Sequence, residues 1–257
     1  MARLSSVANS IRVLTSFSGG EDEIAITTLA RRLGLAKSTV HRLASTLTSA
    51  GFLEQNSDTG RYRLGVALFE LGALVRRRMD VANEARPHLR ELLEKTGETV
   101  QLGIADHHSV LYVYEMESRR AIRMAAAVGA RAPLHCTAVG KVLLAFQSED
   151  YIGEVLERGL TSFTARTVTR RDAVLELLGE VRSREYAIDD EESEPGLRAV
   201  AAPVRNHNGV VIAALGVAAP VQRMNKKVMQ TTVPIVIASA EAVSTRLGYS
   251  ADRRKSA

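Results

Sequence analysis

Short polar and basic side chains cluster over residues 37–46, and their chemistry suits contacts with nucleic acid. The apolar residues Val40, Leu43 and Leu47 recur at the spacing of one helix face, so the polar residues fall on the opposite face. Hydroxyl, imidazole and guanidinium groups on a short helix can reach base edges and phosphates in a DNA major groove. We therefore predict DNA contacts from Lys37, Ser38, Thr39, His41, Arg42, Ser45 and Thr46.

A helix-turn-helix would present that polar face outward. Residues 24–33 carry apolar side chains at helical spacing and are predicted to form the first helix, with Thr27 and Thr28 as N-cap candidates. Gly34 can adopt the positive φ that a tight turn after this helix requires. Another amphipathic helix over residues 6–17 would complete a small three-helix core.

A hairpin is predicted directly after the helix-turn-helix, because residues 52–64 form two strand-like runs around a turn-rich loop. The second run is basic, as a wing that touches DNA needs to be, so Arg61 and Arg63 join the predicted DNA contacts. Residues 65–78 then predict a linker helix that ends in three arginines. These arginines either contact DNA or lie in solvent at a helix end that favours positive charge.

Each of these residues also has a simpler interpretation. Arg42 could be a solvated surface residue, and His41 is evenly balanced between the two readings. Ser38 or Thr39 could be satisfied by capping the helix alone.

Composition and charge narrow the class of protein. A length of 257 residues suggests one large or two ordinary domains, and a hydrophobic content of 46% is enough to form their cores. Residues 1–80 hold 11 Lys and Arg against seven Asp and Glu, whereas the rest of the chain is nearly balanced. The positive excess thus lies where DNA is predicted to bind. The apolar runs are too short to cross a bilayer, and the first residues lack the apolar core of a signal peptide, so we expect a cytoplasmic protein with no membrane partner.

The remainder of the chain predicts an α+β domain, in which helices and strands segregate around an antiparallel sheet. The expected helices span residues 84–95, 136–146, 171–185 and 228–247, and the expected strands span residues 100–105, 110–115, 122–127, 199–205 and 210–218. The predicted organisation is a DNA-binding domain (1–64), a linker helix (65–80), a ligand-binding domain (81–248) and a flexible tail (249–257).

Cys136 is the candidate nucleophile outside the DNA-binding unit. Its thiol, at a predicted helix start beside His135, could have a lowered pKa. That would make the protein a small-molecule enzyme with an N-terminal interaction module. No third orienting group is identifiable, and a free cysteine is more often a buried hydrophobe, so we predict that Cys136 lines a pocket in a protein that is not an enzyme. No Cys, His or Asp set has zinc spacing, and the pair His107 and His108 suits a turn; no metal or cofactor is predicted.

Three segments together resemble the IclR family of bacterial transcription regulators. Leu29–Leu43 is similar to the family's DNA-reading segment almost residue by residue, Leu134–Ala145 resembles its effector-domain helix motif, and Asp189–Val204 resembles its acidic loop and following strand. The resemblance covers residues 6–248. It implies a winged helix-turn-helix, a linker helix and a GAF-like effector-binding domain, in homodimers or dimers of dimers on palindromic operator DNA.

The resemblance also implies an effector, either a small organic acid or an aromatic metabolite, and control of a catabolic operon. The implied pocket positions are Gly129, Ala130, Asp189, Leu197, Ala199, Gly216 and Ala218. Where the family often has Cys and two Ser, this chain has Ala199, Gly216 and Ala218, so we expect a roomier and more apolar pocket. Helix N-terminal amides near Cys136 and Thr137 could still hold a carboxylate. A constitutive architectural DNA-binding protein, whose second domain only dimerises, is the remaining alternative.

Overall fold

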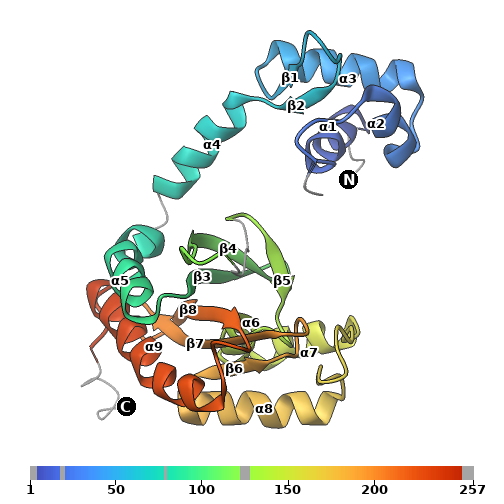
Figure 1. Ribbon diagram of the computed structural model, residues 1–257. Coiled ribbons are helices and arrows are strands. Elements are labelled where there is room, and N and C mark those ends of the chain that lie inside the picture. Colours follow the sequence, from blue (N-terminus) through green and yellow to red (C-terminus); the bar gives the residue numbers. More distant parts are fainter. Residues whose placement is uncertain (1–4, 18–20, 78–79, 122–127, 251–257) are drawn as a thin grey trace. The chain divides into compact units, whose positions relative to one another are not determined.

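The computed structural model describes residues 5–17, 21–77, 80–121 and 128–250. The chain forms two compact units, Met1–Met79 and Asp80–Ala257. Figure 1 shows the elements of both units, which are described separately below.

The N-terminal unit packs three helices against a two-stranded wing. Its elements are α1 (Ser5–Thr15), α2 (Ile26–Leu33), α3 (Lys37–Ser49), β1 (Leu53–Gln55), β2 (Tyr62–Leu64) and α4 (Val66–Arg77). The core takes buried side chains from α1, α2, α3 and both strands, among them Val13, Leu29, Val40, Leu53 and Tyr62. Strands β1 and β2 pair antiparallel, so the predicted winged helix-turn-helix is confirmed.

The turn between α2 and α3 follows the prediction at its first residue. Gly34 ends α2 in the left-handed region with φ of 66°, and the amide of Leu35 donates to the carbonyl oxygen of Ala30 at 3.1 Å. This arrangement satisfies the last carbonyls of α2 while the chain reverses direction.

The predicted N-cap of α2 is wrong. Ala25, rather than Thr27 or Thr28, precedes the helix in an extended conformation, and no side chain caps it. The helix begins one residue before Thr27, because the carbonyl oxygen of Ala25 already accepts from the amides of Thr28 and Leu29. Both threonines therefore lie inside the helix, where their side chains cannot serve as its N-cap.

The start of α3 likewise lacks a side-chain cap. Its N-cap residue is Ala36, whose side chain offers no acceptor. Capping of α3 therefore does not account for Ser38 and Thr39, both of which are exposed.

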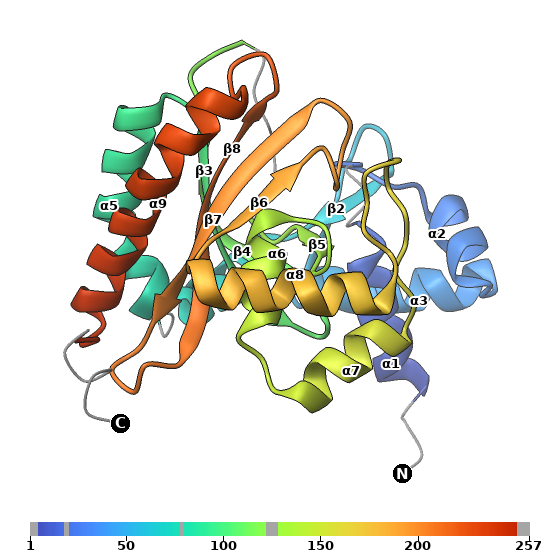
Figure 2. The same ribbon diagram turned by 90° about the horizontal axis from the view of Figure 1, so that it is seen from below.

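The C-terminal unit is an α+β domain built on an antiparallel sheet, as predicted. Its strands are β3 (Thr99–Asp106), β4 (Ser109–Met116), β5 (Arg131–Pro133), β6 (Ala187–Asp190), β7 (Leu197–Arg205) and β8 (Val211–Pro220), in the order β5-β4-β3-β8-β7-β6. Its helices are α5 (Asp80–Thr96), α6 (Ala138–Ala145), α7 (Glu149–Glu157), α8 (Arg171–Arg184) and α9 (Lys226–Arg246). Figure 2 shows α5 beside α9, and these two helices cover one face of the sheet while α6 packs on the other with α8 behind it.

Some elements of this unit differ from the prediction. Elements β5, α7 and β6 were not predicted from the sequence. Of these, β5 and β6 are short strands at the two edges of the sheet. The sequence of β6 includes Asp189 and Asp190, whose charges favoured a loop. The predicted strand at residues 122–127 and the predicted tail beyond residue 250 lie outside the described residues.

Gly140 tests how tightly α6 is packed. A β-carbon there would lie 2.5 Å from the carbonyl oxygen of Pro133 and 2.7 Å from the Cα of Leu134. We expect Gly140→Ala to lower the free energy of unfolding by about 1–3 kcal/mol, because the clash with backbone outweighs the gain in helix propensity. Urea denaturation of the full chain measures the change.

Gly179→Ala in α8 is the matched control, because no atom lies within 4 Å of the β-carbon that it adds. This variant should gain about 0.5–1 kcal/mol from the removal of a helical glycine. Equal effects of the two substitutions would contradict the close packing of α6.

Candidate DNA-binding face and ligand cavity

Helix α3 separates apolar from polar side chains in the way that DNA reading requires. Val40, Ala44 and Leu47 are buried against the rest of the N-terminal unit. The seven predicted contact residues are all exposed on the helix: Lys37, Ser38, Thr39, His41, Arg42, Ser45 and Thr46. The structure therefore brings them together on one accessible surface of a rigidly packed helix.

The wing is held in shape by Glu23. Its carboxylate accepts from the Asn56 side-chain amide at 2.8 Å and from the Thr59 hydroxyl at 3.2 Å, and these bonds lower the pKa of Glu23. The predicted contacts Arg61 and Arg63 are both exposed on this hairpin. Arg63 forms an ion pair with Glu54 on the opposite strand, with Nη2 and Oε2 2.8 Å apart, so its charge is partly offset.

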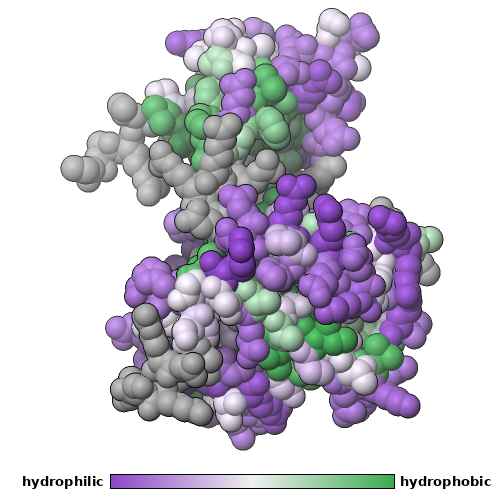
Figure 3. Space-filling model, turned by 90° about the vertical axis from the view of Figure 1, so that its left-hand side faces the viewer, coloured by the Kyte–Doolittle hydropathy of each residue, from purple (hydrophilic) through white to green (hydrophobic). Residues whose placement is uncertain are grey.

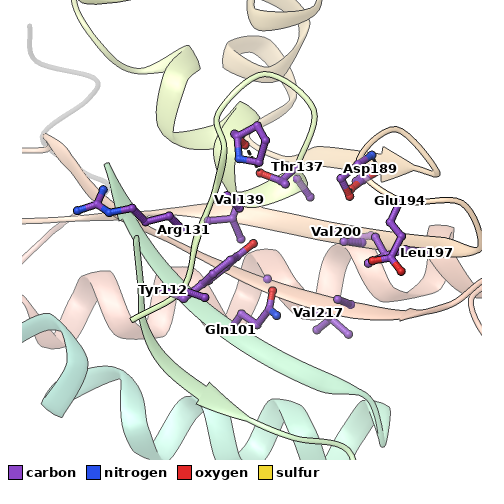
Figure 4. Close-up of a pocket in the computed structure, with 18 residues that line it drawn as sticks. Gln101, Tyr112, Arg131, Thr137, Val139, Asp189, Glu194, Leu197, Val200 and Val217 are labelled. Carbon is purple, nitrogen blue, oxygen red and sulfur yellow. Dashed lines mark hydrogen bonds between the residues drawn. The ribbon is translucent and has the colours of Figure 1, made fainter. Parts of the chain in front are cut away.

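A cavity of about 320 Å³ lies between the start of α6 and the sheet of the C-terminal unit (Figure 4). This volume is in the range of pockets that hold small organic molecules. Of the predicted pocket residues, five line the cavity together with Asp189: Ala130, Leu197, Ala199, Gly216 and Ala218. Polar lining residues that the sequence analysis did not single out are Gln101, Tyr112, Arg131, Ser193 and Glu194.

Strand register explains how distant residues meet in the cavity. Ala199 on β7 pairs with Asp189 on β6 and with Ala218 on β8. In a second row, Gly216 on β8 pairs with Gln101 on β3. Cross-strand partners share a face of the sheet, so each row presents its side chains to the same space.

Asp189 organises the loop that closes one side of the cavity. It is only 1% exposed. Its Oδ1 accepts from the backbone amides of Glu192 at 2.8 Å and Ser193 at 3.3 Å, and its Oδ2 accepts from the Ser193 hydroxyl. Burial raises the pKa of Asp189, although these hydrogen bonds and the charge of Lys141 oppose the shift. Both carboxylate oxygens of Asp189 therefore accept hydrogen bonds from the loop that follows it.

A buried ion pair ties the same loop to α6. The Nζ of Lys141, a residue that is 1% exposed, donates to Oε1 of Glu192. The other oxygen, Oε2, is buried with no hydrogen-bond partner among the described residues. Burial raises the pKa of Glu192, and the Lys141 charge counteracts the rise. Such a pair is costly to break from one side, because the remaining charge stays buried.

Two predicted pocket residues do not line the cavity. Gly129 directly precedes the lining residue Ala130 but is not itself part of the lining. Cys136 is fully buried, two residues before α6 begins. Burial, with the nearby carboxylates of Asp189 and Glu192, raises the pKa of the Cys136 thiol to about 12. The nucleophilic thiolate is thus disfavoured near neutral pH, which argues against the enzyme alternative.

The loss of a side chain at Gly216 does not open free space next to it. A β-carbon there would lie 3.1 Å from Cγ2 of Val139 and 3.1 Å from the carbonyl oxygen of Val200. Val139, in the first turn of α6, therefore occupies the room beside Gly216. The methyl groups of Val139 make the wall apolar at this point, and the extra room that we predicted for the pocket is not found beside Gly216.

Of the missed residues, Gln101 had one weak signal in the sequence. Gln101 is a polar residue between Val100 and Leu102 in a strand that is buried on both faces. A buried amide needs a hydrogen-bonding partner, which marks such a position as a candidate site residue.

The described part of the chain also lacks two other kinds of feature. It contains no helix that is both long and apolar enough to cross a membrane. Nor do three or more of its His, Cys, Asp or Glu side chains come together in a group that could hold a metal ion.

The fold and the polar face of α3 define a winged helix-turn-helix DNA-binding domain followed by an α+β domain with a small-molecule cavity. The family model described as the IclR helix-turn-helix domain matches residues 6–57, and the model of the bacterial transcriptional regulator IclR C-terminal domain matches residues 73–245. The chain belongs to the IclR family of bacterial transcriptional regulators.

Known relatives match nearly the whole chain. The HTH-type transcriptional regulator KdgR of Escherichia coli K12 is 38% identical over 90% of this chain and 88% of its own length. The regulator XynR of the same organism is 36% identical over 98% of this chain and 100% of its own. A solved IclR homologue from Microbacterium hydrocarbonoxydans, complexed with 4-hydroxybenzoate, has a TM-score of 0.86 at 31% identity and covers 95% of this chain and 99% of its own. KdgR and XynR are both transcriptional regulators of the helix-turn-helix type.

Removing the Lys141 cation tests the buried ion pair. We expect Lys141→Met to lower the free energy of unfolding by about 3–5 kcal/mol, because Glu192 stays buried without its cation. The double variant Lys141→Met with Glu192→Gln should recover most of the loss. Chemical denaturation of the three proteins measures both changes.

Arg184→Met is the matched control, because it breaks a surface pair with Glu180 in which both side chains are about half exposed. It should change the stability by less than about 1 kcal/mol. A Lys141→Met variant no less stable than this control would show that the buried pair does not hold the loop.

Proposed function

We propose that this protein is an effector-responsive, sequence-specific DNA-binding regulator of a catabolic operon. The observation that carries the proposal is the exposed polar face of α3. The polar residues between positions 37 and 46 lie on this face, and the apolar residues of the helix are buried on the opposite face. Lys37, Ser38 and Thr39 at the helix start suit phosphates, and Arg42 suits a base edge. A regulator of this kind works where the DNA is, which in a bacterium is the cytoplasm.

We infer that a small organic effector binds in the C-terminal cavity. Three features support this: the cavity volume of about 320 Å³, its mixed polar and apolar lining, and the position of Ala138 and Val139 at the helix start. First-turn amides of a helix have no partner within the helix and favour a carboxylate. A solved relative that is complexed with 4-hydroxybenzoate supports an organic acid or aromatic metabolite as the class of effector.

We infer that two copies of the chain assemble through α4. Its apolar side chains are unusually exposed for a helix of a folded domain: Val66, Phe69, Leu71 and Leu74, of which Phe69 is 71% exposed. Val7 and Ile11 of α1 are exposed as well, and hydrophobic side chains gather on the face of the N-terminal unit seen in Figure 3. A second copy would bury this surface and set two α3 helices at a fixed spacing on palindromic DNA.

Specific DNA binding tests the proposal directly. Fluorescence anisotropy would compare DNA from beside the gene with random DNA over a salt titration. We expect the specific site to bind about 10³-fold or more tightly, with a steep salt dependence of affinity. Equal affinity for both DNAs, with and without a panel of candidate effectors, would contradict a site-specific regulator. A rise in melting temperature with an effector would argue against a purely architectural role.

Arg42 provides the sharpest mutational test of the reading face. We expect Arg42→Ala to weaken specific operator binding by about 1–3 kcal/mol, because a bidentate contact to a base is lost. Arg184→Ala removes the same charge from an exposed position in the C-terminal unit and should leave specific binding nearly unchanged. If both variants bind the operator as well as the parent does, Arg42 is not a reader.

Phe69 tests the assembly through α4. We expect Phe69→Glu to weaken self-association by about 1.5–3 kcal/mol, because a charged side chain replaces a buried aromatic one. Sedimentation equilibrium over a range of concentrations measures this change. Phe163→Glu is the control, since Phe163 is also exposed but lies in the C-terminal unit. Dissociation caused by Phe163→Glu alone would place the interface elsewhere.

A further inference from the structure

Two buried polar side chains form one end of the cavity, and neither is fully satisfied by the protein. Gln101 on β3 is 6% exposed and Tyr112 on β4 is 7% exposed, yet both line the cavity. Figure 4 shows the oxygen atoms of the two side chains pointing toward the same part of it. The Tyr112 hydroxyl has no hydrogen-bond partner among the described residues. This hydroxyl opens onto the cavity, so a ligand that displaces water from it must supply a hydrogen-bonding partner in place of that water.

A bulge in the sheet is responsible for aiming Tyr112 at this place. Gln101 pairs with Glu115, but two residues along β3 Gly103 pairs with Tyr112, so β4 carries one extra residue. Without this extra residue, Val113 would share the face of Gln101. Bulges commonly redirect a side chain in this way.

Gly103 allows α6 to approach the sheet closely next to Tyr112. A β-carbon at Gly103 would lie 2.7 Å from Cγ1 of Val139 and 3.6 Å from Cδ1 of Tyr112. The sheet and α6 therefore approach closely where the cavity ends.

The hydrogen-bonding roles of the two groups are complementary. Burial, with the negative charge of Asp189 nearby, raises the pKa of Tyr112, so its hydroxyl remains protonated and can donate. The Nε2 of Gln101 donates to Oε2 of Glu115 at 3.4 Å, which leaves its Oε1 as an acceptor. The cavity thus ends in a donor beside an acceptor.

Only a group that both accepts and donates can satisfy this pair. An alcohol or phenol hydroxyl does so, whereas a carbonyl or carboxylate oxygen can only accept. We propose that the effector carries a hydroxyl group, which accepts from the Tyr112 hydroxyl and donates to Oε1 of Gln101. This inference rests on the proposed function, because it takes the cavity to be the effector site.

The start of α6 offers a place for an acid group at the other end of the molecule, although Asp189 and Glu194 add carboxylates to the lining. Arg131 is the basic residue in the lining, but its guanidinium is already bound to Asp106 and Ser109. The backbone amides at the start of α6, where the helix dipole is positive, are therefore the donors left for a carboxylate. Leu197, Val200 and Val217 supply an apolar wall between the two ends. The chemical class is a hydroxylated organic acid.

Matched pairs of acids test this proposal on the full-length protein. Calorimetry would compare glycerate with propionate, gluconate with hexanoate, and para-hydroxyphenylacetate with phenylacetate. We expect the hydroxylated member of at least one pair to bind about 10-fold or more tightly, since its rival leaves the buried pair unsatisfied. Tyr112→Phe and Gln101→Met should each remove that preference without weakening the binding of the unhydroxylated acid.

Tyr114→Phe is the matched control, because it makes the same change on the same strand at a residue outside the cavity lining. It should keep the preference. The proposal is overturned if no hydroxylated acid binds at millimolar concentration, if the unhydroxylated acids bind as well, or if Tyr112→Phe keeps the preference.

Operator binding by the same proteins separates this failure from failure of the proposed function. Release of a specific operator by an acid that lacks a hydroxyl would leave the regulator intact and overturn the hydroxyl site. Hydroxyl-dependent binding of an acid, in a protein that binds no specific DNA, would do the reverse.

Discussion

The complete burial of α6 is the constraint on which the C-terminal unit depends. All eight residues of this helix are buried, Lys141 included, between the sheet and α8. A lysine can be held there only with a partner, and Glu192 supplies one from the loop after β6. The loop is therefore fixed by the charge that α6 brings inside. Asp189 and Ser193, which line the cavity, take their positions from this arrangement.

Helix α3 of the N-terminal unit is packed differently, because most of its residues are polar. Helix α3 buries only a stripe formed by Val40, Ala44 and Leu47, so its polar residues remain free for a partner. Rigidity comes from elsewhere: the wing is paired to Ile24 through two backbone hydrogen bonds with Tyr62, and Glu23 holds its loop. The reading helix therefore contributes little polar chemistry to its own domain, which leaves that chemistry available for DNA.

Elements with strong local signals could be predicted from the sequence, and those set by tertiary contacts could not. Helix α3 and the β7–β8 hairpin have clear periodicity and turn residues. Strand β6 was missed because aspartates such as Asp189 are more common in loops than in strands. The Asp189 carboxylate can be buried in this strand because the loop amides donate to it and the charge of Lys141 lies nearby. The resemblance located six of the eighteen residues that line the cavity, but the position of Tyr112 depends on a bulge. Alternation along one strand cannot reveal a bulge, because it arises from the register between two strands.

The position of the cavity bears on how a ligand could influence the DNA-binding unit. A compound bound equally well by two states of the protein shifts neither, so its contacts must differ between them. Gln101 and Tyr112 lie on β3 and β4, the strands against which α5 packs from the other face. Helix α5 follows α4 directly in the chain, and α4 exposes the apolar side chains that a second copy would cover. A ligand that bridges Gln101 and Tyr112 as proposed would therefore contact the two strands on which α5 packs from one face and α6 from the other.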